Sequence, residues 1–325
     1  MSFLFSTPLP DELAQTHLYR VCAMNNLNYT RLLPQETKGL RPKNCNHPWT
    51  WIHMHHIMSD LSDMTPQAYR AHHTLMLLTK HWDKVYSQDP VKESTHSVYH
   101  YSQFQADSSG STYEFKICPD CRKEDLRAFS MTYWHREHQI PGLDICPKHQ
   151  TSLMKFESSC AWLTPNPVDI EGKIPSEALV MANFHPVVRR YQDIALCTLR
   201  NSSLVRFNRA QEKLLARAIE LGICQERIRH TGHGSYLESH IPQYLYNNLP
   251  RAWMAEHFSA NFLKDDFYPT EWSPDQYHTE LDRLKSAGMA EPIFILLALA
   301  TLFESTESIC SILLEPANNL VLPRP

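Results

Sequence analysis

The sequence lacks the marks of several large protein classes. Its longest nearly unbroken apolar run, residues 293–303, has 11 residues, whereas a helix that crosses a bilayer needs about 20. It contains no P-loop motif, and the glycines of residues 231–235 are too few to cradle a phosphate. We therefore expect no membrane partner and no ATP hydrolysis, and we interpret residues 293–303 as a buried helix.

We also expect no secretory signal peptide, because the first seven residues have neither a basic start nor a long apolar core. The nine cysteines are an odd number, and the pattern described below assigns three of them to a metal ion. We therefore expect a protein of the reducing bacterial cytoplasm.

The chain has no excess of positive charge. Its net charge of −4 and isoelectric point of about 6.5 argue against a protein that grips bare DNA by bulk electrostatics. The charge is uneven, however, since residues 183–231 contain nine bases and four acids, whereas residues 261–325 contain four bases and ten acids. The first stretch suggests a nucleic-acid surface and the second a basic partner, with solvated charged faces as the alternative. The candidate nucleic-acid-binding residues are Arg189, Arg190, Arg200, Arg206, Arg209, Lys213, Arg217, Arg227 and Arg229.

Length and hydrophobic periodicity predict a mainly α-helical protein of several parts. A chain of 325 residues exceeds the usual size of one domain. We predict an N-terminal helical domain over residues 1–100, a central zinc-ribbon or zinc-knuckle module over residues 113–160, and a C-terminal helical bundle over residues 175–325.

The N-terminal part contains a possible helix-turn-helix. A helix from about residue 50 is followed by a turn, and Thr65 and Pro66 then form the start signal of a second helix, expected to reach about residue 80. A plain helical bundle is the alternative, because no basic recognition face accompanies the pair.

Six histidines crowd the same region and raise the question of a second metal site. Neighbouring histidines on a helix point to different faces, so few of them can converge. We expect surface or partly buried side chains instead. These residues are His53, His55, His56, His72, His73 and His81.

Two pairs of metal-ligand residues stand out in the centre of the chain. Cys118 and Cys121 are separated by two residues, as are Cys146 and His149, and 24 residues lie between the pairs. Three thiolates and an imidazole are a donor set typical of tetrahedral Zn²⁺, and a proline after the first cysteine of each pair favours a tight turn. Four protein ligands leave no open coordination position, so we expect one structural zinc ion.

These pairs and the segment between them resemble the TniQ/TnsD family, the target-selection proteins of heteromeric (TnsABC-type) DNA transposons. The family signature combines a CPxC pair, a tryptophan followed by HQxPG, and a CPxH pair. The start of the chain and the helix that begins at Thr65 are also similar, so the resemblance covers roughly the first half of the chain. The residues that carry the motif are Cys118, Pro119, Cys121, Trp134, His138, Gln139, Pro141, Gly142, Cys146, Pro147 and His149.

The resemblance implies a non-catalytic adaptor that marks where a transposon inserts and joins a target recogniser to an AAA+ ATPase regulator. Long relatives bind DNA through an extended C-terminal region, whereas shorter ones, often dimers, ride on an RNA-guided CRISPR Cascade complex. Since this chain is short and ends in an acidic stretch, we favour the Cascade-associated kind. Its N-terminal segment would contact the ATPase, and its basic stretch would contact guide RNA or target DNA. A direct sequence-specific DNA binder of the same family is the alternative.

A zinc-dependent nuclease is the alternative of another class. His135 and His138 lie between the ligand pairs, and Asp125 and Asp144 are the available acids. Such an enzyme needs a second, open, hydrolytic metal ion, and the spacing of these residues does not point to one. We therefore expect His138 to form a hydrogen bond within the module and to orient a metal ligand.

Overall fold

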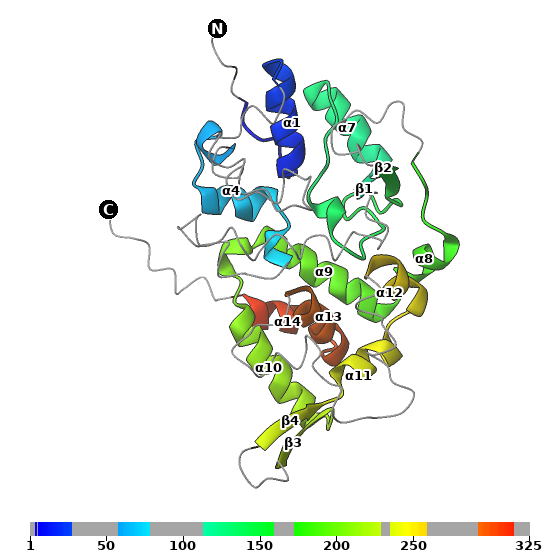
Figure 1. Ribbon diagram of the computed structural model, residues 1–325. Helices are drawn as coiled ribbons and strands as arrows, with labels where there is room; N and C mark the ends of the chain where they lie inside the picture. The colour runs from blue at the N-terminus through cyan, green and yellow to red at the C-terminus, as the bar shows by residue number, and fades with distance from the viewer. Residues whose placement is uncertain are drawn as a thin grey trace.

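The computed structural model describes Leu4 and residues 6–27, 58–78, 113–158, 172–228, 235–258 and 292–314. The described chain is mainly helical, as predicted, and also contains two short antiparallel strand pairs (Figure 1). Within these residues, no helix is both long and apolar enough to cross a membrane.

The elements fall into an N-terminal and a C-terminal half. The first half contains α1 (Ala14–Met24), α4 (Pro66–His73), the 3₁₀ helix η3 (Met76–Leu78), β1 (Tyr113–Ile117), α7 (Pro119–Phe129), η5 (Glu137–Gln139) and β2 (Met154–Ser158). The second contains α8 (Glu177–Ala182), α9 (Pro186–Arg200), η7 (Ser202–Leu204), α10 (Phe207–Glu220), β3 (Cys224–Ile228), β4 (Ser235–Ser239), α11 (Ile241–Asn248), α12 (Arg251–His257), α13 (Pro292–Leu302) and α14 (Thr306–Leu313).

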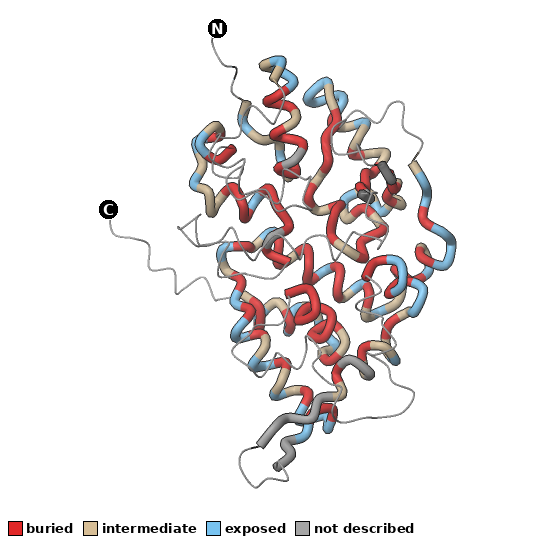
Figure 2. Tube along the Cα trace, viewed as in Figure 1, coloured by how far each residue is buried: buried red, intermediate tan, exposed pale blue. Residues whose placement is uncertain are grey.

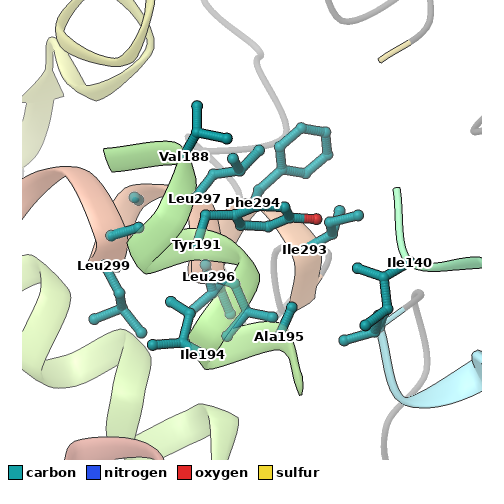
Figure 3. Packing of buried hydrophobic residues seen from close by; sticks show 14 of the residues in the cluster. Ile140, Val188, Tyr191, Ile194, Ala195, Ile293, Phe294, Leu296, Leu297 and Leu299 are labelled. Carbon is teal, nitrogen blue, oxygen red and sulfur yellow. The ribbon is translucent and has the colours of Figure 1, made fainter. Parts of the chain in front are cut away.

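The C-terminal half is organised around α13, in which every residue except Thr301 is buried. Because a helix that is apolar on all sides is stable only in an interior, α9, α10 and α11 pack around it. Figure 3 shows Val188 and Tyr191 of α9 packed with Phe294 and Leu297 of α13. The prediction of a buried central helix is confirmed.

Helix α4 begins as predicted but ends early. The Ala68 N–H donates to the Thr65 hydroxyl at 3.1 Å, which confirms the predicted cap. The helix stops at His73 instead of continuing towards residue 80. The backbone of Thr74 is extended, and its hydroxyl donates to the carbonyl of Arg70 at 2.7 Å, so the side chain bonds to a carbonyl near the helix end.

Residues 58–78 present no basic face of the kind that a DNA-reading helix-turn-helix uses. Arg70 of α4 is fully buried, and its Nε donates to the carbonyl of Pro66. The exposed positions of this segment are Asp60, Asp63, Thr65 and His72. Their chemistry favours the plain helical alternative for this part of the chain.

The two strand pairs were not anticipated from the sequence. β1 and β2 pair in antiparallel register, with Ile117 opposite Met154. This pairing brings the start and the end of the central module together. β3 and β4 also pair in antiparallel register, and residues 229–234 between them lie outside the described part of the chain. Each strand has five residues. The sequences of β1 (YEFKI) and β2 (MKFES) alternate between apolar and polar residues, a strand signal that sequence analysis did not use.

Buried apolar residues form two clusters in the described chain. Figure 2 shows the buried positions in red along the trace. The smaller cluster joins Leu18 of α1 and Tyr69 of α4 to Phe115 of β1, whose ring stacks on Trp134 with centroids 5.2 Å apart. The larger one runs from Ile140 through α9 to α13. The division into domains over residues 1–100, 113–160 and 175–325 stays a prediction.

A Pro-Gly turn docks the central module on the C-terminal helices. The Leu143 N–H donates to the Ile140 carbonyl at 3.1 Å, and Gly142 has a φ of +78°. The Gly142 carbonyl accepts hydrogen bonds from Trp253 Nε1 (3.1 Å) and Gln192 Nε2 (2.7 Å). A Cβ at this position would lie 2.3 Å from the Trp253 ring. Both the conformation and the close approach therefore require glycine.

We predict that Gly142→Ala lowers the free energy of unfolding by about 3 kcal/mol, since the methyl group adds a clash with Trp253 to the cost of a positive φ. Gly222→Ala is the matched control, because Gly222 has a φ of +70° and no atom lies within 4 Å of its added Cβ. The control should lose only about 1 kcal/mol. Urea unfolding measures both values, and equal losses would contradict the close approach of Trp253.

Candidate metal centre

Strand β1 and helix α7 position the first ligand pair. β1 ends at Ile117, and Cys118 is the N-cap residue of α7, with an extended backbone (φ −84°, ψ 127°). Pro119 occupies the first helical position, where its fixed φ is favourable and no N–H is needed. Cys121 follows in the first turn, so the two thiols approach each other across the start of the helix.

A tight turn positions the second pair. The Gln150 N–H donates to the carbonyl of Cys146 at 2.9 Å, and the Cys146 N–H donates to the carbonyl of Thr151 at 2.8 Å. Gln150 has a φ of +55°, which reverses the chain. The His149 N–H points to Cys146 Sγ at 3.4 Å, as in a knuckle that folds around a metal ion.

The four side chains converge on one point. Their ligand atoms, three sulfurs and His149 Nδ1, all lie within 4.8 Å of one another. The sulfurs of Cys121 and Cys146 are 3.7 Å apart, and His149 Nδ1 lies 3.5, 3.3 and 3.7 Å from the three sulfurs in chain order. Tetrahedral Zn²⁺ places sulfurs roughly 3.8 Å apart and a sulfur and nitrogen roughly 3.6 Å apart. The cluster can therefore hold one metal ion, and its donor set fits zinc.

Electrostatics make a cation necessary for the fully deprotonated cluster. The hydrogen bond from the Cys121 thiol lowers the pKa of Cys146, and that same bond, together with burial, raises the pKa of Cys121. Cys146 thus loses its proton easily, whereas Cys121 keeps its proton. Because adjacent buried thiolates repel one another, all three cysteines can be deprotonated together only if a positive ion lies between them.

Polar groups around the sulfurs complete the cluster. The Thr151 hydroxyl lies 3.2 Å from Cys118 Sγ. His138 Nε2 lies 3.7 Å from Cys121 Sγ and 3.6 Å from Cys146 Sγ. Burial lowers the pKa of His138, so the ring is neutral, and its Nε2–H tautomer can donate to these thiolates. This position agrees with the hydrogen-bonding role expected for His138.

Glu124 orients the imidazole ligand, and sequence analysis missed it. Its Oε1 lies 3.1 Å from His149 Nε2, while its other oxygen pairs with Lys148. A histidine that binds metal through Nδ1 carries its proton on Nε2, and a carboxylate partner fixes that tautomer and raises the basicity of the ligand. The available signal was helical spacing, since Glu124 follows Cys121 by three residues on α7.

The family comparison agrees with this geometry. The family model TniQ matches residues 3–153, a range that includes α1, α4 and the whole metal centre. Residues 3–153 are a TniQ domain. The predicted TniQ/TnsD resemblance is thus confirmed, and the domain indicates a role in target-site selection during DNA transposition. Among curated proteins, the search found no match.

Within the TniQ domain, the start of the chain pairs with the motif segment. The Leu13 N–H donates to the carbonyl of Trp134 at 2.8 Å, and the Arg136 N–H donates to the carbonyl of Asp11 at 2.8 Å. The Arg136 side chain returns to Asp11 Oδ1 at 3.1 Å. The motif tryptophan therefore lies where the N-terminal segment meets the metal module.

The next motif residue, Gln139, joins the same segment to strand β1. Its Oε1 accepts the Lys116 N–H at 2.9 Å, and its Nε2 donates to the Lys116 carbonyl at 2.7 Å. The amide side chain thus forms the two hydrogen bonds that the backbone of a neighbouring strand would form with Lys116. The ammonium of Lys116 in turn donates to the carbonyls of Ile140 and Leu143 at 2.8 and 2.7 Å, which fixes the Pro-Gly turn.

The histidine-rich region of the TniQ domain has no shared site in its described part. His72 is exposed, whereas His73 is buried and its Nδ1 donates to the carbonyl of Glu12 at 2.8 Å. The two neighbours therefore face different surroundings, as expected from helical geometry. The other members of the group, His53, His55, His56 and His81, lie outside the described residues.

The acids named for a nuclease have separate histidine partners. Asp125 Oδ2 lies 2.9 Å from His135 Nε2, and Asp144 Oδ2 lies 2.7 Å from His257 Nε2. Both carboxylates are buried. In the described part of the chain, the Cys₃His cluster is the only group of three or more His, Cys, Asp or Glu residues arranged to hold a metal ion.

Several of the candidate nucleic-acid-binding residues make contacts within the protein. Arg190 donates to the carbonyls of Ala300 (2.8 Å) and Glu304 (3.0 Å) at the end of α13. Arg200 forms a two-pronged ion pair with Glu137 of the TniQ domain, with both N–O distances at 2.6 Å. These side chains connect elements of the fold, a role that charge counting cannot distinguish from nucleic-acid contact.

Two further candidates, Arg206 and Arg217, also make contacts within the protein. Arg206 donates to the carbonyls of Ser203 and Val205, and Arg217 contacts the carbonyl of Leu302 and pairs with Glu220 at 3.2 Å. The side chains of Arg227 and Arg229 lie outside the described part of the chain.

Five of the described basic candidates are exposed, and two of them, Arg200 and Arg206, make the contacts given above. The other three are Arg189, Arg209 and Lys213. Arg189 lies on α9, while Arg209 and Lys213 lie one turn apart on α10. Neither Arg209 nor Lys213 forms an ion pair with any described residue. Arg209 and Lys213 thus form a short basic strip on α10, and nucleic-acid contact by any of the nine candidates stays a prediction.

We predict that Glu124→Ala weakens the affinity of the centre for Zn²⁺ about 10-fold, because the His149 ring loses the acceptor that fixes its tautomer. Competition with a chromophoric chelator measures the affinity. Asp120→Ala is the control, since this carboxylate lies on the same helix but pairs with Lys123. Lys148→Ala removes the other partner of Glu124. If it weakens the affinity for Zn²⁺ as much as Glu124→Ala does, the effect comes from loss of the surface ion pair and not from the imidazole.

Proposed function

We propose that the protein is a non-catalytic adaptor in DNA transposition, which links a target recogniser to an AAA+ regulator. The observation that supports this most is the metal cluster within the TniQ domain. Three sulfurs and an imidazole already supply the four ligands of a tetrahedral ion, so no position is left for a substrate or an activated water. A centre of this kind shapes a docking surface and performs no reaction.

The ion that we assign to the cluster is one structural Zn²⁺. It joins β1, the start of α7 and the turn at residues 146–149. Between these parts lie Trp134, which contacts the N-terminal segment, and Gly142, which contacts Trp253. The zinc would therefore stabilise the segment that connects the two halves of the protein.

We expect the purified protein to contain one zinc ion per chain, and strong chelation to lower its melting temperature, since metal binding is coupled to folding. Zinc should be released as the pH falls, because protons compete for the three thiolates and the imidazole. Elemental analysis and thermal unfolding at several pH values measure this. A chain that keeps the same melting temperature without any bound metal would refute the structural role.

The recogniser that we favour is an RNA-guided CRISPR Cascade complex. Arg209 and Lys213 would contact the phosphates of guide RNA or target DNA, and the N-terminal segment would contact the AAA+ regulator. A strip of two exposed bases on a chain with a net charge of −4 supplies too few phosphate contacts for tight binding to bare DNA. A homodimer stays a prediction for the assembled complex.

A pull-down with the tagged protein tests the partners directly. The bait is offered the AAA+ regulator, a Cascade complex with guide RNA, and naked target DNA in parallel. We expect the first two to be retained and the DNA to be lost at physiological salt. Retention of specific DNA alone, with affinity falling steeply as salt rises, would instead establish the direct DNA-binding alternative. Metal-dependent cleavage that is lost on His135→Ala would establish the nuclease.

We predict that the double substitution Arg209→Ala/Lys213→Ala weakens retention of Cascade about 10-fold, because two phosphate contacts are lost. Binding of the AAA+ regulator should not change. The matched control is Lys123→Ala/Arg127→Ala, which removes two exposed charges from α7 on another surface. Equal losses in both double variants would show that only overall charge matters and would argue against a site on α10.

A further inference from the structure

Two cysteines outside the metal centre face each other across packed helices. Cys197 lies on α9 and Cys310 on α14, and these helices pack together. Their sulfurs are 3.0 Å apart although the residues are 113 positions apart in the sequence. Two thiols at this distance need little movement to form a covalent bond.

Exposure separates this pair from the other cysteines. Of the seven cysteines in the described part of the chain, Cys197 and Cys310 alone are partly exposed. The other five are buried: Cys22, Cys118, Cys121, Cys146 and Cys224. A small oxidant in solution can therefore reach the pair, whereas the fold shields the remaining described thiols.

The surroundings give the two thiols different reactivity. The hydrogen bond from Cys310 lowers the pKa of Cys197 to about 7 against the effect of burial, with further help from the Asn201 amide at 3.8 Å and from Arg200. The same bond, burial and the nearby carboxylates of Glu307 and Asp193 raise the pKa of Cys310. Cys197 is thus the attacking thiolate and Cys310 the resolving thiol.

We propose that Cys197 and Cys310 are a reversible disulfide site that reacts with small disulfides such as glutathione disulfide. In the first step, the Cys197 thiolate attacks one sulfur of glutathione disulfide, forms a mixed disulfide and releases one glutathione thiolate. In the second step, Cys310 loses its proton, attacks the Cys197 sulfur and displaces the second glutathione. Two protein thiols are oxidised, and one glutathione disulfide is reduced to two thiols.

The bond would fasten α14 to α9 and close a loop of residues 197–310. Closing so long a loop restricts the unfolded chain and stabilises the fold. Helix α14 also packs on α10, which bears Arg209 and Lys213. Oxidation would therefore make the support of this basic strip more rigid. The inference is independent of the proposed adaptor function.

The test uses the full-length protein with its zinc bound. It is incubated with glutathione disulfide, free thiols are blocked with iodoacetamide, and the digested peptides are analysed by mass spectrometry. We expect a link between the peptides that contain Cys197 and Cys310, reversal by dithiothreitol, and a rise in melting temperature of about 5 °C. Two unlinked thiols, or a link from either residue to Cys45 or Cys160, would overturn the proposal.

Single variants test the order of the steps. Cys310→Ser should trap one glutathione on Cys197, whereas Cys197→Ser should leave Cys310 as a free thiol. Cys224→Ser, which alters a buried cysteine on β3, should form the link as the unmodified chain does. Glutathione on Cys310 but not on Cys197 would contradict the assigned roles.

A second probe needs no substitution and no oxidation. Phenylarsine oxide, a trivalent arsenical, bridges two thiols that lie close together. Peptide mapping should locate one arsenic on Cys197 and Cys310 of the native chain. Failure of the arsenical to bridge this pair would refute their proximity, even if the serine variants could not be purified.

Discussion

The close approach of four ligand atoms is the constraint on which the rest of the structure depends. Three sulfurs and His149 Nδ1 lie within 4.8 Å of one another, and most of their surroundings are buried. Without a cation, thiolates at this distance repel one another, so binding of an ion would be coupled to folding of the module. The strands β1 and β2, the start of α7 and the Cys146–His149 turn have their positions because they bring these atoms together.

The segment between the ligand pairs connects the two halves of the molecule. Trp134 packs with the N-terminal segment, and Gln139 forms hydrogen bonds with the backbone of strand β1. The carbonyl of Gly142 accepts a hydrogen bond from Trp253 of α12. A signature that reads like a catalytic motif, with its histidine, glutamine and tryptophan, thus consists mainly of packing and hydrogen-bonding residues. This arrangement is the one that an adaptor requires, since a contact at one end can be transmitted through a rigid joint to the other.

Local signals were sufficient for the parts that sequence analysis predicted correctly. The spacing of Cys118, Cys121, Cys146 and His149 specified the candidate ligand set, Thr65 specified the start of α4, and a nearly unbroken apolar run identified α13. Predictions failed where a distant group decided the outcome. The alternating pattern of β1 and β2 is only five residues long in each strand, and the two segments lie 36 residues apart in the sequence but pair across the module. Charge counting could not foresee that Arg190 and Arg200 bond within the fold.

The sequence by itself determined the family, the metal ligands and the central buried helix, because each depends on residues whose chemistry or spacing acts over a few positions. Only the tertiary structure decided which charges stay free, which carboxylate supports the imidazole ligand, and that Cys197 meets Cys310. Those outcomes depend on contacts between residues up to 113 positions apart. Such contacts follow from how whole helices pack, and no local pattern of residues encodes them.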